Sequence, residues 1–376
     1  MEDFEKEKAI EARYYQPVFT RDLKIVRGEG AKVWDAKGKE YIDCVAGIAV
    51  VSTGHCHPAV VGAICRQAGE LIHCSNLYYV PGQAELAREL SEITGLGKVF
   101  LTNSGTESTE AAIKLAKVRT GRKRFVAFTH GFHGRSTGAL AVTHKPAIRE
   151  PFLPLEPECT FVDFGDLDGV RKAVTEETAG VFIEPVQGEA GVIIPPEGFI
   201  AGVREICDDR GALLIDDEVQ SGMGRTGKWL AIEHEGVAPD IVTLAKGIGS
   251  GFPMGALVAR DGLEFKPGEH GSTFAGGPLA CAAALATIGV IREILPTVIP
   301  KGERFRRGLA EFNPRVRGLM VGVSVGARCP GVQKRCAARG VLVNCAADGN
   351  LRLVPPLVIR DDEIDAAIGV IHEALG

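Results

Sequence analysis

The sequence predicts an α/β protein with a large domain on a mostly parallel central sheet and a smaller α/β domain formed by both termini. The chain has 376 residues, which is long enough for more than one domain. Short apolar runs alternate with helical patterns in its middle part, as in sheets covered by helices. Mixed segments with short strands lie at both ends. We place the domain segments at residues 1–50, 51–275 and 276–376, the first and last forming the small domain.

Six apolar runs in the middle of the chain are predicted to be strands. They are Val99–Thr102, Phe125–Phe128, Gly180–Glu184, Ala212–Val219, Ile241–Ala245 and Met254–Ala259. The helical patterns between them are Glu107–Val118, Leu167–Val174 and Phe199–Arg210. Because ligands bind beyond the carboxyl ends of strands in such sheets, we expect the functional residues directly after these runs.

The two ends of the chain differ from the middle. The first 50 residues contain short strands around a turn at "WDAKGKEYID". The last hundred or so begin with a helical pattern and end with another. The predicted elements there are the helix Pro278–Ile294, the strands Leu319–Ser324 and Leu351–Val354, and the helix Asp361–Leu375.

Composition excludes several classes of function. The chain is 45% hydrophobic and 24% charged, as in ordinary globular proteins, and its net charge of -5 argues against nucleic acid as a partner. No apolar stretch is expected to reach about 18 residues, so no membrane partner is predicted. The charged N-terminus lacks the apolar core of a secretory signal, which predicts a cytoplasmic protein.

Cysteines and histidines give no sign of a metal site. The ten cysteines are scattered without a CxxC pair, and most are expected to be small buried apolar residues in a reducing compartment. The cluster His55-Cys56-His57 with His73-Cys74 fits no common zinc spacing. We therefore predict no metal.

The segment "LTNSGTESTEAAIKLAK" predicts a strand, a turn through Ser104, Gly105 and Thr106, and a helix. Free backbone N–H groups and the helix dipole make such a helix start a binding site for anions, and Gly105 allows close approach. The alternative is that Ser104 only caps the helix, with Glu107 and Glu110 in its first turn.

The segment "LLIDDEVQSGMGRTGKW" places Asp217 at the end of an apolar strand, facing away from Asp216 and Glu218. A buried carboxylate needs a cationic partner or several hydrogen bonds. The protonated ring nitrogen of a cofactor would serve, as would a nearby arginine. The segment also matches GxxxxGK, but Trp229 stands where a nucleotide-binding loop has Ser or Thr, so we reject a nucleotide hydrolase.

Lys246 follows the apolar run Ile241–Ala245 and precedes a glycine-rich turn. In an apolar setting the pKa of a lysine falls, and its neutral amine can form a Schiff base with a carbonyl. Alone, Lys246 would more often be a surface lysine. Together with Asp217 and the helix-start anion site, it meets the three needs of pyridoxal phosphate: a covalent tether, a partner for the ring nitrogen and an anchor for the phosphate.

Two further segments supply candidates for ring and substrate binding. In "FTHGFHGRSTGAL", Phe132 is a candidate to stack on the cofactor ring, and Arg135 to hold a substrate carboxylate through two parallel hydrogen bonds. His133 is a candidate proton carrier or merely closes the loop.

A second pair of segments suggests a buried ion pair. "EPVQGEAGV" places Glu184 and Glu189 at the end of another strand, and "LRLVPPL" contains Arg352 as a lone cation in an apolar strand. A buried cation of this kind requires a carboxylate partner. We expect one of the two glutamates to provide it.

Over nearly its whole length the chain resembles the class III (ornithine-type) aminotransferases. The matching motifs are "GHCHPAV" (Gly54–Val60), "NSGTESTEAAIKLAK" (Asn103–Lys117), "FHGR" (Phe132–Arg135), "EPVQGEAGV" (Glu184–Val192), "DEVQSGMGRTG" (Asp217–Gly227), "LAKGIGSGFPMGA" (Leu244–Ala256) and "GSTFAGGPLACAAAL" (Gly271–Leu285). The resemblance implies the fold type I architecture, pyridoxal 5'-phosphate as cofactor, and a homodimer that shares its active site across the interface. Position 216 departs from the family, which usually has an apolar residue where this chain has Asp216. We expect that carboxylate to face away from the ring.

The resemblance also implies a role for each matching residue. Lys246 would be the Schiff-base lysine and proton shuttle, Asp217 the partner of the pyridine nitrogen, and Phe132 the stacking ring. Gln220 would lie near the cofactor hydroxyl. The phosphate would be held by Ser104, Gly105 and Thr106, with Thr273 reaching it from the other subunit.

Three residues would bind substrates. Arg135 would grip the α-carboxylate of the amino acid, and Glu189 would pair with Arg352. In relatives this pair closes while the amino donor is bound and opens so that the arginine can bind 2-oxoglutarate.

Within the class, "GIAVVSTGHCHPAV" and "IHCSNLYY" are most similar to members that act on N-acetyl-L-ornithine. This implies ping-pong transfer of its terminal amino group to 2-oxoglutarate, giving N-acetyl-L-glutamate 5-semialdehyde and L-glutamate, in arginine biosynthesis. Ornithine, succinylornithine, 4-aminobutyrate, N-acetyl-lysine and carrier-linked lysine stay alternative donors. The rival classes are a non-catalytic module that binds the cofactor and a racemase or mutase on the same fold.

Overall fold

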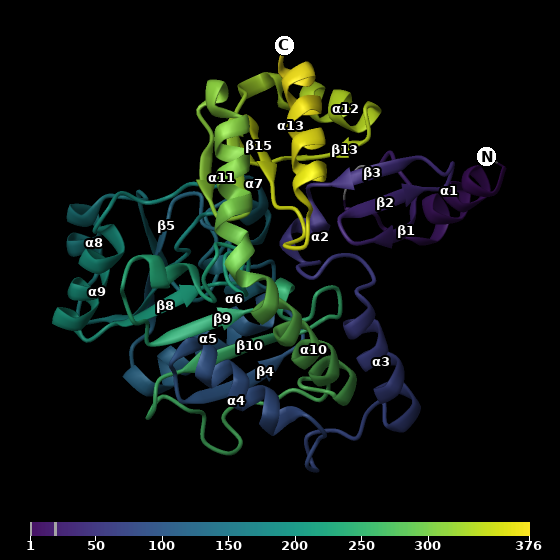
Figure 1. Cartoon of the computed structure of the whole chain (residues 1–376). Coiled ribbons are helices and arrows are strands. Elements are labelled where there is room, and N and C mark those ends of the chain that lie inside the picture. The colour runs from purple at the N-terminus through teal and green to yellow at the C-terminus, as the bar shows by residue number, and fades with distance from the viewer. Residues whose placement is uncertain (1, 19–20) are drawn as a thin grey trace.

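A seven-stranded sheet forms the centre of the computed structural model, which describes residues 2–18 and 21–376 (Figure 1). Its strand order is β4-β10-β9-β8-β7-β5-β6. The strands are β4 (Lys98–Thr102), β5 (Arg124–Phe128), β6 (Cys159–Val162), β7 (Thr178–Ile183), β8 (Leu213–Asp217), β9 (Ile241–Leu244) and β10 (Gly255–Ala259). Strands β5 to β9 pair in parallel, whereas β10 is antiparallel to both β4 and β9. The predicted α/β fold with a mostly parallel sheet is confirmed.

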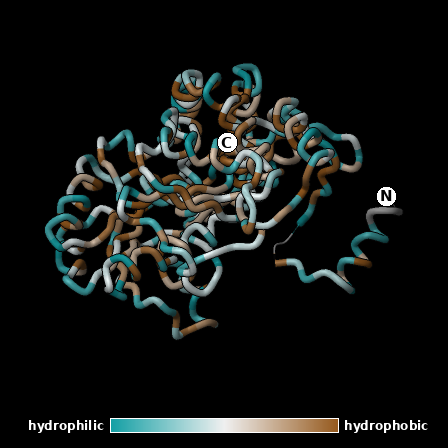
Figure 2. Tube along the Cα trace, turned by 90° about the horizontal axis from the view of Figure 1, so that it is seen from below, coloured by the Kyte–Doolittle hydropathy of each residue, from teal (hydrophilic) through white to brown (hydrophobic). Residues whose placement is uncertain are grey.

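Helices cover both faces of this sheet because apolar side chains alternate along its strands. In β5, Val126 and Phe128 join one buried cluster, and Phe125 and Ala127 join another. The first cluster contains residues of α8 (Leu167–Ala173) and α9 (Phe199–Arg210), and the second contains residues of α5 (Gly105–Thr120). Figure 2 shows the hydrophobic segments gathered in the middle of the molecule, whereas the N-terminal helix is mostly hydrophilic.

Two four-stranded sheets are formed by the two ends of the chain. One contains β1 (Ile25–Glu29), β2 (Lys32–Asp35), β3 (Glu40–Asp43) and β13 (Val341–Leu342), and the other contains β11 (Arg315–Arg317), β12 (Met320–Ser324), β15 (Asn350–Leu353) and β14 (Asn344–Cys345). Strand β13 pairs in parallel with β3, so a C-terminal segment completes an N-terminal sheet (Figure 1). The boundaries at 1–50, 51–275 and 276–376 stay predictions.

The remaining helices connect or cover these sheets. They are α1 (Glu2–Tyr14), α2 (Ala46–Ala49), α3 (Pro58–Glu70), α4 (Gln83–Thr94), α6 (Thr137–Ala141), α7 (Pro146–Arg149), α10 (Pro278–Ile294), α11 (Val298–Gly308), α12 (Cys329–Ala338) and α13 (Asp361–Leu375). The bounds of α9, α10 and α13 agree with the predicted ones. Strand β6 was not predicted, and β8 ends two residues early because Asp217 Oδ1 accepts a hydrogen bond from Val219 N–H (3.0 Å), which turns the chain.

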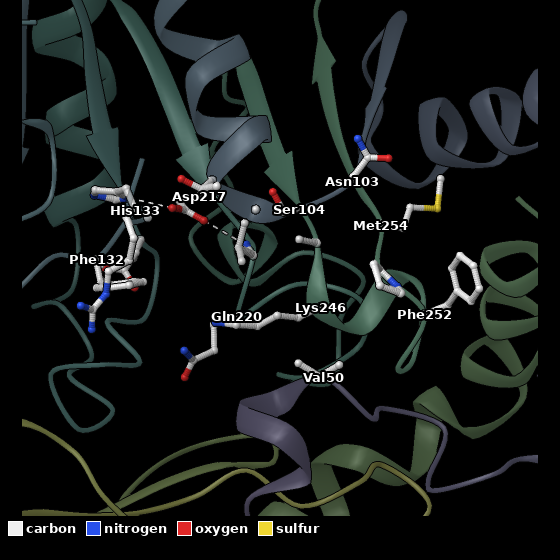
Figure 3. Close-up of a pocket in the computed structure, with 18 of the residues that line it drawn as sticks. Val50, Asn103, Ser104, Phe132, His133, Asp217, Gln220, Lys246, Phe252 and Met254 are labelled. Atoms are coloured by element: carbon white, nitrogen blue, oxygen red, sulfur yellow. Dashed lines mark hydrogen bonds and ion pairs between the residues drawn. The ribbon is translucent and has the colours of Figure 1, made fainter. Parts of the chain in front are cut away.

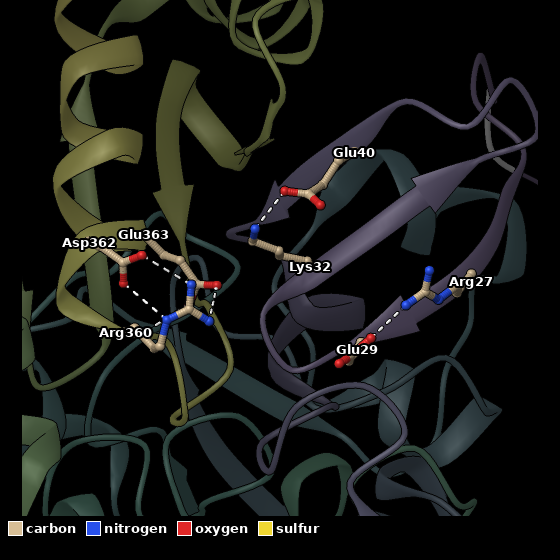
Figure 4. A network of polar contacts seen from close by, with 7 residues as sticks. All are labelled: Arg27, Glu29, Lys32, Glu40, Arg360, Asp362 and Glu363. Atoms are coloured by element: carbon tan, nitrogen blue, oxygen red, sulfur yellow. Dashed lines mark hydrogen bonds and ion pairs between the residues drawn. The ribbon is translucent and has the colours of Figure 1, made fainter.

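The start of α13 is fixed by a local polar network (Figure 4). Glu363, only 3% exposed, accepts a hydrogen bond from the backbone N–H of Arg360 (2.9 Å) and lies 2.8 Å from its guanidinium. Figure 4 also shows the exposed pairs Arg27–Glu29 and Lys32–Glu40 on the N-terminal sheet. Exposed ion pairs of this kind contribute at most about 1 kcal/mol to the free energy of unfolding, so the buried Glu363 cap contributes more to stability.

One expectation about cysteines is wrong. Cys329, at the start of α12, and Cys345, on β14, form a disulfide with Cα atoms 5.9 Å apart. Cys56 and Cys65 are free and exposed. The bridged residues lie 16 positions apart and meet because α12 packs against β14, a contact that no local spacing pattern reveals.

One expectation about apolar stretches is also wrong. The helical stretch 278–308 is long and apolar enough, by length and composition, to cross a membrane. It consists of α10 and α11 with residues 295–297 between them. In its most apolar window 44% is buried inside the protein, and α10 packs against α3 and α4. Core helices of globular proteins pass the same test.

Candidate active site

A cavity of about 470 Å³ lies at the carboxyl edge of the central sheet. Three consecutive parallel strands deliver polar residues to it: Glu184 follows β7, Asp217 ends β8, and Lys246 follows β9. The N-terminus of α5 and the loop containing Phe132 complete its polar side. This is the place in the sheet at which the sequence predicted functional residues.

Lys246 reaches into the middle of the cavity (Figure 3). Its backbone has φ +43°, in the left-handed region that non-glycine residues rarely adopt and that often marks functional sites. The side chain makes no hydrogen bond or ion pair with another described residue. Burial lowers the pKa of Lys246, and the nearby charge of Glu189 opposes this effect. A lysine with these properties can react as a neutral amine.

Asp217 is held beside the cavity with His133 (Figure 3). The carboxylate is 3% exposed, and its Oδ2 lies 2.6 Å from His133 Nδ1. Burial lowers the pKa of His133, but the hydrogen bond and the charge of Asp217 outweigh burial and raise it above the ordinary value. His133 is also fixed through its backbone, whose N–H donates to Thr143 Oγ1 (2.9 Å). The imidazole of His133 therefore fixes the position of the Asp217 carboxylate. The sequence did not predict this contact.

Glu184 is a second buried carboxylate in the cavity wall. Its Oε2 accepts a hydrogen bond from the backbone N–H of Phe132 (3.0 Å), which fixes the loop carrying that ring. Burial raises the pKa of Glu184 to about 7, although the charge of His133 opposes this shift. Arg135 lies with its guanidinium carbon 6.0 Å from the Phe132 ring centroid. It lines the cavity and forms no hydrogen bond or ion pair with another described residue.

The N-terminus of α5 fits both interpretations of its sequence, a helix start that binds an anion and a helix start capped by Ser104. Ser104 caps the helix, since its side chain accepts a hydrogen bond from Glu107 N–H (3.3 Å). The backbone N–H groups of Gly105 and Thr106 donate to no described residue and lie at the cavity. A Cβ on Gly105 would come within 2.9 Å of Val219 Cγ1, so a larger residue there would force Val219 to move. An anion can bind these N–H groups while Ser104 still caps the helix.

Arg352 and Glu189 form the buried ion pair that the sequence predicted. Arg352 is 1% exposed, and its Nη1 donates to Glu189 Oε1 (2.6 Å) and to Gln220 Oε1 (3.0 Å). Gln220 Nε2 also donates to Glu189 Oε1 (3.2 Å). Burial raises the pKa of Glu189, but the charges of Arg352 and Lys246 and the hydrogen bonds from Arg352 and Gln220 together keep it below the ordinary value. Gln220 lines the cavity, whereas the two charged residues lie behind it.

Two residues lie apart from the cavity. Thr273, predicted to reach the phosphate from another subunit, is exposed and does not line the cavity of its own chain. Asp216 is fully buried, neither carboxylate oxygen has a hydrogen-bond partner, and it does not line the cavity. Burial, with the charges of Glu218 and Asp217, raises its pKa well above the ordinary value.

The family is decided by comparison with known proteins. The Aminotransferase class-III family model matches residues 13–375. The chain is a class-III aminotransferase. It is 52% identical over 374 residues to the acetylornithine aminotransferase of Methanosarcina acetivorans, which covers 97% of this chain and 95% of that protein. It is 54% identical to the acetylornithine aminotransferase of Methanopyrus kandleri, covering 96% and 97%.

A solved structure agrees in fold. The ornithine aminotransferase of Toxoplasma gondii, crystallized with oxidized glutathione and with pyridoxal phosphate at partial occupancy in its active site, superposes with a TM-score of 0.94. It is 32% identical and covers 99% of this chain and 94% of that one. Pyridoxal phosphate is the cofactor of class-III aminotransferases.

The aminotransferase cavity fits this cofactor. An unpaired lysine accounts for the covalent tether, a buried carboxylate on β8 for a ring-nitrogen partner, and free N–H groups at α5 for a phosphate anchor. Among the described residues, no group of three or more His, Cys, Asp and Glu side chains could hold a metal ion.

Sequence reasoning missed the apolar wall of the aminotransferase cavity. Phe252 and Met254 line the side beyond Lys246, and Val50 lies near the lysine (Figure 3). The glycine-rich turn after Lys246 was a signal for the first two. Val50 lies in "GIAVVSTGHCHPAV", a segment that carries the family resemblance, but no local pattern in that segment indicates that its side chain lines the cavity.

Proposed function

We propose that this aminotransferase transfers the terminal amino group of N-acetyl-L-ornithine to 2-oxoglutarate. The products are N-acetyl-L-glutamate 5-semialdehyde and L-glutamate, a step of arginine biosynthesis. The observation that carries the proposal is the unpaired Lys246 in a cavity shared with Asp217, in a chain about half identical to acetylornithine aminotransferases over nearly its full length.

Seven residues of the cavity would hold the cofactor. Lys246 is its covalent attachment point, Asp217 stabilises the protonated ring nitrogen, and Phe132 packs on the ring. The N–H groups at Ser104, Gly105 and Thr106 bind the phosphate. Gln220 would lie at the ring hydroxyl, because it lines the cavity and also contacts the Arg352–Glu189 pair.

Bound pyridoxal phosphate supplies an aldehyde that condenses with amines and a ring that takes up the electron pair of a broken C–H bond. Nζ of Lys246 would accept the proton that leaves the reacting carbon of the donor. Its lowered pKa suits this task, because a neutral amine is the base. The buried Asp217 carboxylate keeps the ring nitrogen charged throughout.

Arg135 would bind the substrate carboxylate that lies far from the reacting carbon, which is the α-carboxylate of the donor and the distal carboxylate of 2-oxoglutarate. Replacing it with lysine should raise KM for both the donor and 2-oxoglutarate about tenfold, since a point charge replaces a planar fork. Steady-state kinetics with both substrates checks this. The matched control is Arg27→Lys, an exposed arginine of the N-terminal sheet, which should leave both constants unchanged. Unaltered constants in the Arg135 variant would argue against this role.

A donor screen tests the substrate. N-Acetyl-L-ornithine should give a kcat/KM at least about tenfold above ornithine, succinylornithine, N-acetyl-lysine and 4-aminobutyrate, with glutamate formed in each turnover. A higher value for another donor would replace the proposed substrate. Turnover without 2-oxoglutarate would indicate a racemase or mutase. A cofactor spectrum that no donor changes would indicate a binding module.

We also propose a homodimer in which Thr273 contacts the phosphate site of the partner subunit. The support is an exposed apolar group near Thr273 that includes Leu77, Tyr78, Tyr79 and Phe274. Light scattering should give twice the chain mass of 39.9 kDa, and the single mass would contradict the proposal. We also propose a cytoplasmic location, because eight of the ten cysteines are free although Cys329 and Cys345 are bridged, and cell fractionation tests it.

A further inference from the structure

A strained turn lies directly before Val50 in the chain. The four residues of α2, 46–49, have φ values of +50°, +64°, +67° and +60°. Gly47 is the only glycine among them. In the left-handed conformation the Cβ of any other residue lies too close to the following carbonyl oxygen, so single residues adopt it and runs of it are rare. Such strain persists where the surroundings fix it, and it is concentrated at functional sites.

One buried carboxylate fixes the start of this turn. Asp43, at the end of β3, is 5% exposed. Its Oδ1 accepts hydrogen bonds from the backbone N–H groups of Val45 (2.8 Å) and Ala46 (2.9 Å). Its Oδ2 accepts a hydrogen bond from Nε2 of His55 (2.8 Å). The imidazole therefore orients the carboxylate, and the carboxylate orients the first N–H groups of the turn.

The other end of the turn carries Val50 into the wall of the cavity. The backbone N–H of Val50 donates to Ala46 O (2.8 Å), so the position of Val50 follows from the turn. Among the described residues that precede Asn103, Val50 alone lines the cavity. Figure 3 shows it across Lys246 from Asp217. Because the cofactor would take the side of Asp217 in the proposed function, Val50 faces the space that would remain for the substrate.

A further contact ties the segment after the turn to the loop after Lys246. Thr53 Oγ1 lies 2.7 Å from Ser250 Oγ, which also accepts a hydrogen bond from Thr53 N–H (2.9 Å). Both residues are buried, and Ser250 belongs to the glycine-rich turn that follows the lysine. The wall at Val50 and the base of the lysine are therefore joined by a direct contact.

We propose that Asp43 is a positioning residue that holds the left-handed turn 46–49, and that this turn places Val50 against the methylene chain of the amino donor, which limits the length of that chain. The inference deepens the proposed function, because it names the residues that select the donor. A branched apolar side chain suits this contact, since burying methylene groups against apolar surface is favourable. Asp43 does not line the cavity, so it acts on the donor through Val50.

The first experiment measures one ratio in each variant. This ratio is kcat/KM for N-acetyl-L-ornithine divided by kcat/KM for N-acetyl-L-lysine, which is longer by one methylene. Val50→Ala makes room for the longer chain and should lower the ratio about tenfold, the lower end of the discrimination that one methylene gives in an apolar pocket. General damage to the enzyme would lower both rates and leave the ratio unchanged. A wild-type ratio in Val50→Ala would overturn the role of Val50.

A double-mutant cycle tests Asp43. Asp43→Ala removes the acceptor of the two backbone N–H groups and should lower the same ratio about threefold. The double variant Asp43→Ala/Val50→Ala should have the ratio of Val50→Ala alone, because the first change acts through the second residue. Effects that multiply, as for two independent sites, would overturn the positioning role.

Three further variants separate the hydrogen bonds from charge and folding. Asp43→Asn keeps an oxygen acceptor for the turn and should retain the ratio within about twofold, whereas a change as large as in Asp43→Ala would overturn the assigned contact. Asp209→Ala, at an exposed position of α9 outside the cavity, should leave the ratio unchanged. If Asp43→Ala does not fold, His55→Ala, which removes the donor to Oδ2, takes its place in the cycle.

The donor screen separates failure of this inference from failure of the proposed function. If another donor replaces N-acetyl-L-ornithine, the proposed substrate is wrong, and the ratio is then taken between that donor and its homologue longer by one methylene. If N-acetyl-L-ornithine is the best donor and Val50→Ala keeps the wild-type ratio, only this inference is wrong.

Discussion

Lys246→Ala should reduce transamination by about 10⁴-fold or more. The variant would lose both the proposed covalent attachment point and the proposed base at Nζ, and a positioned acid–base group alone contributes up to about 10⁴-fold. No other described lysine lines the cavity, so no neighbouring amine can substitute. The measurement is glutamate formation from 2-oxoglutarate with each donor of the screen.

A chemical experiment accompanies this kinetic one. Borohydride treatment of the wild-type holoenzyme, followed by peptide mass spectrometry, should place a pyridoxyl group on Lys246. The alanine variant should carry no such group. The control is Lys334→Ala on α12, an exposed lysine that does not line the cavity, which should retain wild-type activity and labelling. A label on another lysine of the wild type would contradict the assignment of Lys246.

The polar side of the site could be predicted from the sequence for a structural reason. Glu184, Asp217 and Lys246 each follow an apolar run, and parallel strands bring the ends of such runs to one edge. The N-terminus of α5 reaches the same edge because it follows β4, whose partner β10 pairs with β9. Local sequence thus determines which residues share that edge.

The contacts between distant segments could not be predicted in this way. Gln220 joins the cavity to Arg352 through side-chain hydrogen bonds, and Asn344 reaches Arg352 across β14, a strand too short to give a periodic signal. The bond between Cys329 and Cys345 depends on how α12 packs. These contacts follow from tertiary packing, which acts between residues whose spacing in the sequence carries no pattern.

The alternation along β8 predicts which way Asp216 faces, but it does not predict the free-energy cost of burying this carboxyl group. Alternation along β8 predicted that Asp216 and Asp217 face opposite sides, and only Asp217 lines the cavity. The sequence did not show that Asp216 is buried without a hydrogen-bond partner. Two adjacent carboxylates therefore have different roles, and substituting each in turn provides a matched pair of variants.

Asp217→Asn should lower kcat about 100- to 1000-fold, the range observed when one preorganised electrostatic partner is removed. Asparagine has the same shape and can still accept the hydrogen bond from Val219 N–H, so the fold of the turn is kept. It carries no charge, so the ring nitrogen of the cofactor would lose the carboxylate that we propose keeps it protonated. The absorbance spectrum of the bound cofactor should change with kcat, and a variant with wild-type kcat would exclude the role of Asp217.

Asp216→Asn is the matched control, and it should leave kcat unchanged while raising Tm near neutral pH. The folded protein raises the pKa of Asp216 well above its value of 3.8 in the unfolded chain. The stability associated with this group is fully present below pH 3.8 and is lost as the pH rises through the folded pKa, because the unfolded chain gains by ionising. Asparagine cannot ionise, so the advantage of the variant should disappear when Tm is measured at acidic pH. A large loss of kcat in this variant would show that charge near β8, rather than the cavity-facing carboxylate of Asp217, controls the reaction.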